Sequence, residues 1–118
     1  MENIILGIGV DVEEIERFDG KTLKNRNFLK KIFTDSELNY CFAKKYPSPH
    51  LAVRFAGKEA VIKSLDGLYK EPIGYNDIEI INDKNGKPSV RIKKSKTKIF
   101  ISLAHTKNIA IASVVVCK

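Results

Sequence analysis

The stretch RFAGKEAVIKSL, from Arg54 to Leu65, has the pattern of a helix buried at the centre of a fold. At about 100° per residue, its apolar side chains and one from the preceding turn form a single stripe. This stripe consists of Leu51, Phe55, Ile62 and Leu65. Glu59 and Lys63 fall together along its edge, where their i, i+4 spacing suits either an ion pair on a solvated face or a pair of functional charges. Spacing alone does not decide between these two interpretations.

The length and composition of the whole chain are typical of one compact domain. It has 118 residues, of which 43% are hydrophobic and 30% charged, so a single domain spanning residues 1–118 is expected. A domain of this size has a small core, which favours a site shared between subunits over a deep cleft within one subunit. Cys41 and Cys117 lie far apart without metal-ligand spacing, and a reduced, cytoplasmic protein is expected. The apolar run at residues 4–10 is too short for a membrane span and lacks the basic start of a signal peptide, so no membrane contact is expected.

In the first half of the chain, the sequence predicts strands and short helices around the central helix. Residues 4–12 are rich in Ile, Val and Gly and predict a strand that is buried on both faces. From Val12 to about residue 29 the apolar spacing is helical, with an interruption near Gly20. Thr34, followed three residues later by Glu37, predicts a capping box at the start of a short helix. The two prolines of YPSPH, residues 46–50, predict a loop before the central helix.

Two hairpins are predicted in the second half of the chain. Asn85 and Gly86 form a turn signal between two apolar runs in residues 77–92. The runs at residues 98–105 and 109–116 flank the turn TKN and predict a second hairpin. The chain therefore has a mixed pattern of helices and strands.

Polar side chains interrupt the predicted strands at two places. Asp11 ends the first strand, where a carboxylate serves either as a metal or catalytic ligand or as the cap of a following helix. His105 ends the strand at residues 98–105, and a lone histidine there is more often structural or exposed. Asp11 and Glu59 come from separate elements, and two carboxylates without a His or Cys cluster suit Mg²⁺ and phosphate chemistry. The G-x-G at residues 7–9 lacks the third glycine of a dinucleotide-binding fingerprint.

Five segments of the chain resemble, in order and spacing, the holo-acyl-carrier-protein synthases, the small bacterial 4'-phosphopantetheinyl transferases. The segments are GIGVDVEEIERF (7–18), FTDSEL (33–38), RFAGKEAVIKSL (54–65), NGKP (85–88) and ISLAHTKNIAIASVVV (101–116). This resemblance implies an α+β fold in which a mostly antiparallel sheet packs on a long helix, and a homotrimer with a site at each subunit interface. It also implies transfer of the 4'-phosphopantetheine arm of coenzyme A to a serine of apo-acyl carrier protein, for fatty acid biosynthesis, with release of adenosine 3',5'-bisphosphate.

The same resemblance implies roles for residues in the matching motifs. Asp11 and Glu59 are expected to bind Mg²⁺ together with the coenzyme A diphosphate, and Lys63 to contact that diphosphate. Lys58 is expected to extend along the pocket or to reach its edge. The serine proton is accepted by Glu59, by Asp11 or by a metal-bound water, and the sequence leaves this choice open. The other residues expected to line the coenzyme A pocket are Arg54, Asn85, Gly86, Lys87, Ser102 and His105.

The charge distribution indicates the kind of partner. The net charge is +7, and Lys and Arg gather in residues 21–31, whereas residues 11–19 are mostly acidic. Such an imbalance favours a polyanionic partner. Acyl carrier proteins are acidic helical bundles, so the resemblance implies a docking face for an acidic helix in place of a merely solvated basic face. The docking residues are expected to be Arg17, Lys24, Phe28 and Lys31, with Phe28 at helical spacing from the two lysines.

Two other functions remain as alternatives at this point. A nucleic-acid-binding domain would lay its basic helix along phosphates, but the strands here are aliphatic and lack interleaved aromatic residues, so no nucleic-acid partner is expected. A carrier-protein-binding module without catalysis is opposed by the presence of both Asp11 and Glu59. The second basic segment, residues 91–98, is expected to face either the 3'-phosphate of coenzyme A or water.

Overall fold

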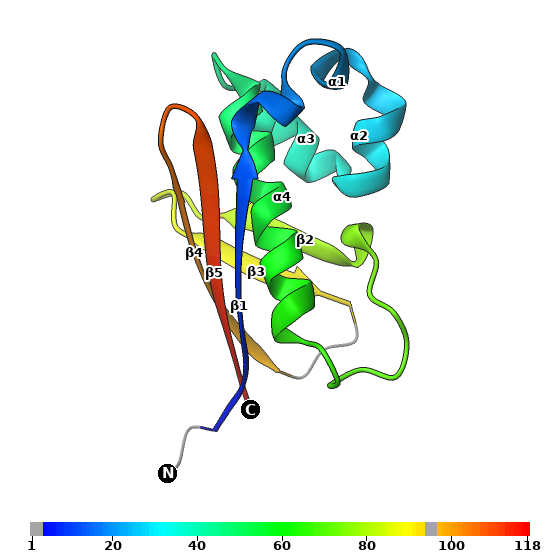
Figure 1. The fold of residues 1–118 in the computed structure, drawn as a ribbon, viewed down its shortest axis with the longest axis vertical. Coiled ribbons are helices and arrows are strands. Elements are labelled where there is room, and N and C mark those ends of the chain that lie inside the picture. Colours follow the sequence, from blue (N-terminus) through cyan, green and yellow to red (C-terminus); the bar gives the residue numbers. More distant parts are fainter. Residues whose placement is uncertain (1–3, 94–96) are drawn as a thin grey trace.

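Strand β1 (Ile5–Glu14) lies along helix α4 (Pro47–Ser64), and this pair forms the centre of the fold (Figure 1). The computed structural model describes residues 4–93 and 97–118. A Cβ atom on Gly7 would lie 1.9 Å from the backbone oxygen of Ser64, so the strand approaches the helix this closely only because the residue has no side chain. The G-x-G pattern at residues 7–9 therefore has a packing role.

The central sheet has three antiparallel strands in the order β1-β5-β4. Strands β4 (Lys98–His105) and β5 (Ile109–Cys117) confirm the predicted terminal hairpin. Ala112, Val114 and Val116 of β5 are buried and belong to the same core cluster as the small residues of α4. The buried face of this sheet is thus the face that packs on the long helix.

The opposite face of the central sheet is apolar and exposed. Ile8 exposes 71% of its surface and Phe100 exposes 60%. The prediction that β1 is buried on both faces is wrong for the single chain, because α4 covers only one side of the sheet. The exposed apolar face consists of Ile8, Val10, Val12, Phe100, Ile109 and Ile111.

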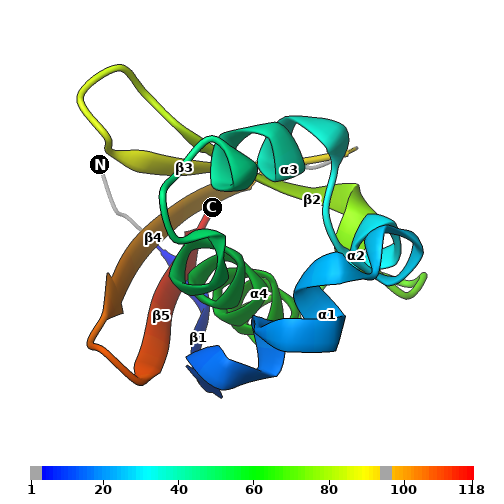
Figure 2. The same ribbon diagram turned by 90° about the horizontal axis from the view of Figure 1, so that it is seen from above.

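A second antiparallel sheet is formed by β2 (Ile78–Asn82) and β3 (Pro88–Ile92), which confirms the other predicted hairpin. The connecting loop, residues 83–87, is longer than a two-residue turn and is closed by the Asp83 N–H, which donates to the Lys87 carbonyl at 2.9 Å. Gly86 has a φ of +86°, the left-handed conformation that glycine adopts without a steric cost. Strand β3 contacts β4, so the hairpin lies beside the central sheet (Figure 2).

Short helices surround the N-terminal half of α4 (Figure 2). They are the 3-10 helix η1 (Ile15–Phe18), α1 (Gly20–Lys24), α2 (Arg26–Ile32) and α3 (Asp35–Phe42). The helical segment predicted from Val12 starts later, because β1 continues to Glu14. Asn25 separates α1 from α2, and its Oδ1 accepts a hydrogen bond from the Phe28 N–H at 3.1 Å. Lys24 and Phe28 therefore lie on different helices, and their predicted spacing along one helix is wrong.

Helix α3 begins with the predicted capping box of Thr34 and Glu37. Glu37 has a further contact that the sequence did not indicate, an ion pair of 2.6 Å between its Oε1 and the Nζ of Lys58, with both side chains fully buried. The expectation that Lys58 extends along the pocket or reaches its edge is wrong, because its ammonium is fully buried and donates to acceptors inside the protein. Besides Glu37, these acceptors are the backbone oxygens of Ile32, Tyr75 and Ile78 at 2.9, 2.9 and 2.7 Å.

Helix α4 begins at Pro47, before the point that the sequence predicted. Pro47 and Pro49 lie in its first turn, where proline is tolerated because the N–H groups there have no partner within the helix. The segment YPSPH is therefore the start of the helix and not a loop.

The chain from the end of α4 to β2 passes through residues 65–74 into the 3-10 helix η2 (Tyr75–Asp77). The ring of Tyr75 packs against Phe55 with 5.4 Å between ring centroids. Residues 94–96 of the basic segment 91–98 lie outside the described residues. Within residues 4–93 and 97–118, no helix combines the length and the apolar character needed to cross a membrane.

Candidate functional site

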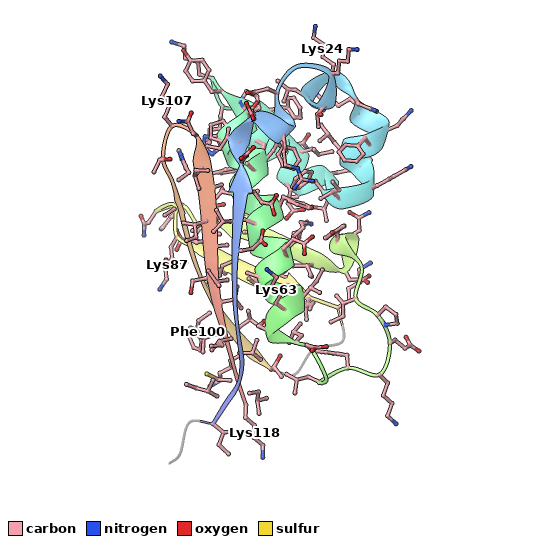
Figure 3. All side chains as sticks on the ribbon, in the orientation of Figure 1. Lys24, Lys63, Lys87, Phe100, Lys107 and Lys118 are labelled. Atoms are coloured by element: carbon pink, nitrogen blue, oxygen red, sulfur yellow. The ribbon has the colours of Figure 1, made fainter. Side chains whose placement is uncertain are left out.

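Asp11 and Lys63 meet at the contact between β1 and α4. Lys63 Nζ donates to Asp11 Oδ1 at 3.1 Å and to the backbone oxygen of Val10 at 3.1 Å. Asp11 lies within β1 and does not end the strand as predicted, because pairing with β5 continues as far as Glu14. Alternation along the strand directs Asp11 towards α4 and away from the exposed apolar face. Lys63, labelled in Figure 3, keeps 54% of its side-chain surface exposed, so its ammonium is accessible to an anion.

A second carboxylate, that of Glu59, lies one helical turn before Lys63. Its Oε1 accepts a hydrogen bond of 2.5 Å from the hydroxyl of Tyr75 in η2. This hydrogen bond is the main reason that the pKa of Tyr75 is raised to about 12. The phenol is therefore protonated at neutral pH and acts as a hydrogen-bond donor to Glu59.

A third carboxylate, that of Glu13, lies on the same face of β1 as Asp11. Its pKa is raised to about 7, chiefly by burial and then by the neighbouring carboxyl group of Asp11, while its contact with the Arg17 guanidinium opposes the rise. We call Asp11, Glu13, Glu59 and Lys63 the acidic group.

Sequence reasoning missed two residues of this region. Glu13 was missed because the predicted strand ended at Val12; continuing the alternation from Asp11 would have placed both carboxylates on one face. Tyr75 was also missed. It lies in a short segment before β2, and no pattern in the sequence connects it with Glu59.

Asp11 and Glu59 fit a hard divalent cation such as Mg²⁺. Asp11 Oδ2 is buried and has no hydrogen-bond partner among the described residues. A buried carboxylate oxygen without a partner is costly unless a ligand satisfies it. In the described part of the chain, no three or more His, Cys, Asp or Glu side chains are arranged to hold a metal ion. Water and substrate phosphate oxygens would therefore complete the coordination, as is usual for Mg²⁺.

Arg54 is the centre of a separate, basic region, roughly 140° around α4 from Glu59. Its guanidinium donates to the side chain of Asn82 and lies 4.2 Å from the ring centroid of Tyr40. Asn82 Nδ2 in turn donates to the backbone oxygen of Gly86 at 2.9 Å. These contacts connect Arg54 with the loop at residues 83–87, which contains three of the predicted coenzyme A residues, Asn85, Gly86 and Lys87.

Two histidines extend this basic region. The rings of His50 and His105 are 6.2 Å apart between centroids. Burial lowers the pKa of His50, and the positive charges of Arg54, Lys44 and His105 lower it further. We call Arg54, His50, His105, Lys44 and the loop at residues 83–87 the basic group. The positive charges of Arg54 and Lys44 make this region electrostatically suited to a phosphate anion.

A single chain does not bring the acidic and basic groups together. Figure 3 shows Lys63 and Lys87 on opposite sides of β1 and β5. Ser102 lies on the exposed face of β4, opposite Ser113, and so points away from α4. Of the residues predicted to bind coenzyme A, only Lys63 belongs to the acidic group. Arg54, His105 and the loop at residues 83–87 belong to the basic group.

Most of the predicted docking residues line one groove, which has a volume of about 480 Å³. Lys24 is the last residue of α1 and lies at the same end of the molecule as the other short helices (Figure 3), but it does not line this groove. Tyr75 lines this groove and donates a hydrogen bond to Glu59, so the groove borders the acidic group. We call it the helix groove; its lining includes Arg17, Phe28, Lys31, Phe55 and Tyr75.

Relatives of known identity match almost the whole chain. The sequence model of the 4'-phosphopantetheinyl transferase superfamily matches residues 7–117. The holo-[acyl-carrier-protein] synthase of Thermodesulfovibrio yellowstonii is 44% identical over 114 residues, which cover 96% of this chain and 99% of the relative.

Solved structures of such synthases have the same fold. A holo-(acyl-carrier-protein) synthase from Bacillus anthracis, in complex with CoA (3',5'-ADP), is 33% identical, covers 97% of each chain and has a TM-score of 0.84. The synthase from Helicobacter pylori, in complex with coenzyme A, is 30% identical over 92% of this chain and 98% of its own, with a TM-score of 0.77. This similarity confirms the predicted α+β fold, with antiparallel strands packed on a long helix.

Proposed function

The chain belongs to the 4'-phosphopantetheinyl transferase superfamily, and we propose that it is a Mg²⁺-dependent holo-[acyl-carrier-protein] synthase. The donor is coenzyme A, the ligand of the related structures, and the acceptor is a serine of apo-acyl carrier protein. The products are holo-acyl carrier protein, used in fatty acid biosynthesis, and adenosine 3',5'-bisphosphate. The observation that carries the proposal is the acidic group, with its exposed ammonium at Lys63, beside the helix groove that Tyr75 lines.

In the proposed reaction, the serine oxygen attacks the phosphorus atom that carries the pantetheine arm. A new O–P bond forms, the bond from that phosphorus to the bridging diphosphate oxygen breaks, and the nucleotide leaves with the electron pair. The serine proton passes to a base, for which the carboxylates of Glu59 and Asp11 are the candidates in this chain.

Asp11 and Glu59 have a different electrostatic role from Lys63 in the proposed reaction. Mg²⁺ bound by Asp11 and Glu59 would supply charge neutralisation at the diphosphate oxygens. The ammonium of Lys63 is held by Asp11 and by the Val10 carbonyl, so it is positioned before substrate arrives. Its positive charge offsets the negative charge that develops on the leaving nucleotide.

We propose that the carrier protein docks in the helix groove. Arg17 and Lys31 supply positive charge for an acidic helix, and Phe28, with 41% of its surface exposed, supplies an apolar contact. Lys24 adds charge outside the groove lining. Because Tyr75 lines the groove and contacts Glu59, a helix docked there would bring its serine close to Glu59.

The proposed active form is a homotrimer in which each site is shared by two subunits. Two observations support it: Lys63 of the acidic group and Lys87 of the basic group lie on opposite sides of β1 and β5 in one chain (Figure 3), and the face of the central sheet turned away from α4 is apolar and exposed. Exposed apolar patches of this kind are typical of interfaces. In the proposed assembly, Arg54, His105 and the loop at residues 83–87 of one subunit complete the coenzyme A site begun by Asp11, Glu59 and Lys63 of its neighbour.

A cytoplasmic location is part of the proposal. Cys41 and Cys117 are both free, as expected in a reducing compartment. The nucleic-acid-binding alternative is not favoured, because the relatives and solved structures that match almost the whole chain are holo-[acyl-carrier-protein] synthases.

The proposed function is tested by the intact mass of apo-acyl carrier protein after incubation with this protein, coenzyme A and Mg²⁺. The carrier should gain the mass of one phosphopantetheine arm, and EDTA should prevent the gain. Asp11→Ala and Glu59→Ala should each abolish transfer while circular dichroism shows a folded protein. Absence of transfer to several carrier proteins by a folded sample, or full activity of both variants, would contradict the proposal.

A further inference from the structure

The carboxylate of Glu59 is held by a side chain from a different part of the fold. Tyr75 belongs to η2, and its hydroxyl lies 2.5 Å from Glu59 Oε1. A hydroxyl donates one hydrogen bond, so Tyr75 occupies one carboxylate oxygen and leaves the other to a different partner. Such a contact determines the rotamer of Glu59 and the direction in which its second oxygen points.

Tyr75 is itself anchored by the residue that precedes Glu59 in the helix. Lys58 Nζ donates to the backbone oxygen of Tyr75 at 2.9 Å, and the Lys58 side chain is fully buried and paired with Glu37. The ring of Tyr75 packs against Phe55, one turn earlier in α4. Tyr75 is therefore fixed to α4 by both its backbone and its ring, and its hydroxyl lies beside Glu59 of the same helix.

The hydroxyl of Tyr75 is the donor in this contact. A phenol is protonated at neutral pH, and an ionised carboxylate only accepts, so the hydrogen bond runs from Tyr75 to Glu59.

We propose that Tyr75 is a positioning residue that orients the carboxylate of Glu59 for a divalent cation shared with Asp11. This inference rests on the proposed function only in the identity of the cation site. In this proposal the hydroxyl of Tyr75, and not its ring, orients the Glu59 carboxylate before the cation binds. Ligands of metals are commonly oriented by such hydrogen bonds, and loss of one typically weakens metal binding by about 10- to 100-fold.

The test is Tyr75→Phe, which removes the hydroxyl and keeps the ring that packs on Phe55 and lines the helix groove. Mn²⁺ serves as the probe, and its binding to the full chain in the presence of coenzyme A, without carrier protein, is measured by electron paramagnetic resonance. The dissociation constant for Mn²⁺ should rise by about 10-fold or more. The matched control is Tyr69→Phe, which removes a phenol elsewhere in the core and should leave the constant unchanged.

A double-mutant cycle separates positioning from a general structural effect. In a Glu59→Gln background, adding Tyr75→Phe should cause no further loss of Mn²⁺ affinity, because the carboxylate that the hydroxyl orients is already absent. In the transfer assay, the Mg²⁺ concentration for half-maximal rate should rise, while the KM for the carrier protein should stay the same because the groove wall is intact.

Unchanged Mn²⁺ affinity in Tyr75→Phe would overturn the proposal, as would a rise in carrier KM without a change in metal dependence. Failure of the proposed function is distinguishable, because it would appear as absence of transfer by the unmodified protein. The comparison of Mn²⁺ binding between the unmodified protein and the Tyr75→Phe variant remains decisive in that case.

Discussion

A Cβ atom added to Gly9 would lie 2.0 Å from the backbone oxygen of Ala60. This close approach holds β1, which carries Asp11, against α4, which carries Glu59 and Lys63. The neighbouring atom is backbone and not the end of a flexible side chain, so the clash is not relieved by a rotamer change. Gly9 is therefore required for the position of the acidic group as well as for the core.

Gly9→Ala should destabilise the protein by about 3 kcal/mol or more, because overpacking against backbone forces the strand away from the helix. Chemical denaturation measures the loss. Gly74→Ala is the control, since its Cβ would meet only Asp77 Oδ2 at 3.4 Å and its backbone is in an ordinary extended conformation. Equal stabilities of the two variants would show that β1 shifts without cost.

Lys58→Met should cost about 3–5 kcal/mol of unfolding free energy, because it leaves the Glu37 carboxylate buried without its partner. Lys63→Met makes the same chemical change five residues later on the same helix. Its side chain is more than half exposed, and the stability cost should stay below about 1 kcal/mol. Urea titrations of both variants give the comparison.

The double variant Lys58→Met/Glu37→Gln identifies the cause of this loss. It should be less destabilised than the sum of the two single changes, because no unpaired charge remains buried. Simple additivity would instead assign the effect of Lys58 to its three hydrogen bonds with backbone oxygens.

Substitutions in the helix groove should weaken carrier binding and leave coenzyme A binding unchanged. Phe28→Ala and Lys31→Glu each remove a proposed contact with an acidic helix, so the KM for carrier protein should rise by about 10-fold while the KM for coenzyme A stays constant. Lys118→Glu, with the same charge change at the opposite end of the molecule (Figure 3), should have no effect. A parallel rise in both KM values would place these residues in the coenzyme A site.

The pKa of His50 should lie below its ordinary value of 6.5 in the free protein, because burial and neighbouring cations disfavour the imidazolium. Nuclear magnetic resonance titration measures it. Lys44→Gln removes one of those cations and should raise the pKa, whereas Lys45→Gln, at the next position, is the control. An equal response to both substitutions would show that Lys44 has no specific influence.

The same shift predicts how stability depends on pH. Below pH 6.5 the histidine is protonated in the unfolded chain while it is still neutral in the folded one, so the unfolded state binds more protons. The contribution of His50 is therefore fully present above pH 6.5 and is lost as the pH falls through the folded-state pKa. A phosphate-bearing ligand such as adenosine 3',5'-bisphosphate should raise the pKa of His50 if it binds the basic group.

The exposed apolar face should be the contact between subunits. Light scattering should give three times the 13.3 kDa mass of the chain, and Ile8→Lys or Phe100→Lys should give a folded monomer without transferase activity. Leu68→Lys, at an exposed apolar residue away from the sheet, is the control. A monomeric, fully active unmodified protein would contradict the shared site.

Mixed assemblies test the shared site directly. Glu59→Ala and His105→Ala chains should each be inactive alone. Refolding them together should restore part of the activity, because some interfaces then combine the intact Glu59 of one chain with the intact His105 of the other. No recovery in confirmed mixed trimers would indicate that each site is built within one chain.

The amino-acid sequence by itself determined the local elements of this protein. The capping box of Thr34 and Glu37, the hairpin around Gly86 and the terminal hairpin follow from neighbouring residues, because turn, cap and alternation rules act over a few positions. The motif residues Asp11, Glu59 and Lys63 were also recognised from the sequence, since their types and spacing match a known family. The start of α4 at Pro47 and the break at Asn25 were missed, because proline and asparagine are compatible with both loops and helix ends.

Only the tertiary structure decided which charges are structural and which are available for chemistry. Lys58 and Lys63 lie on the same helix and were both expected near the pocket, yet Lys58 is buried in the core against Glu37 and Lys63 contacts Asp11 from an exposed position. The contact of Tyr75 with Glu59 and the separation of the acidic and basic groups likewise depend on segments that meet through folding. Burial and long-range contact set the free energy of a charge, and neither quantity is contained in the spacing of residues along one helix.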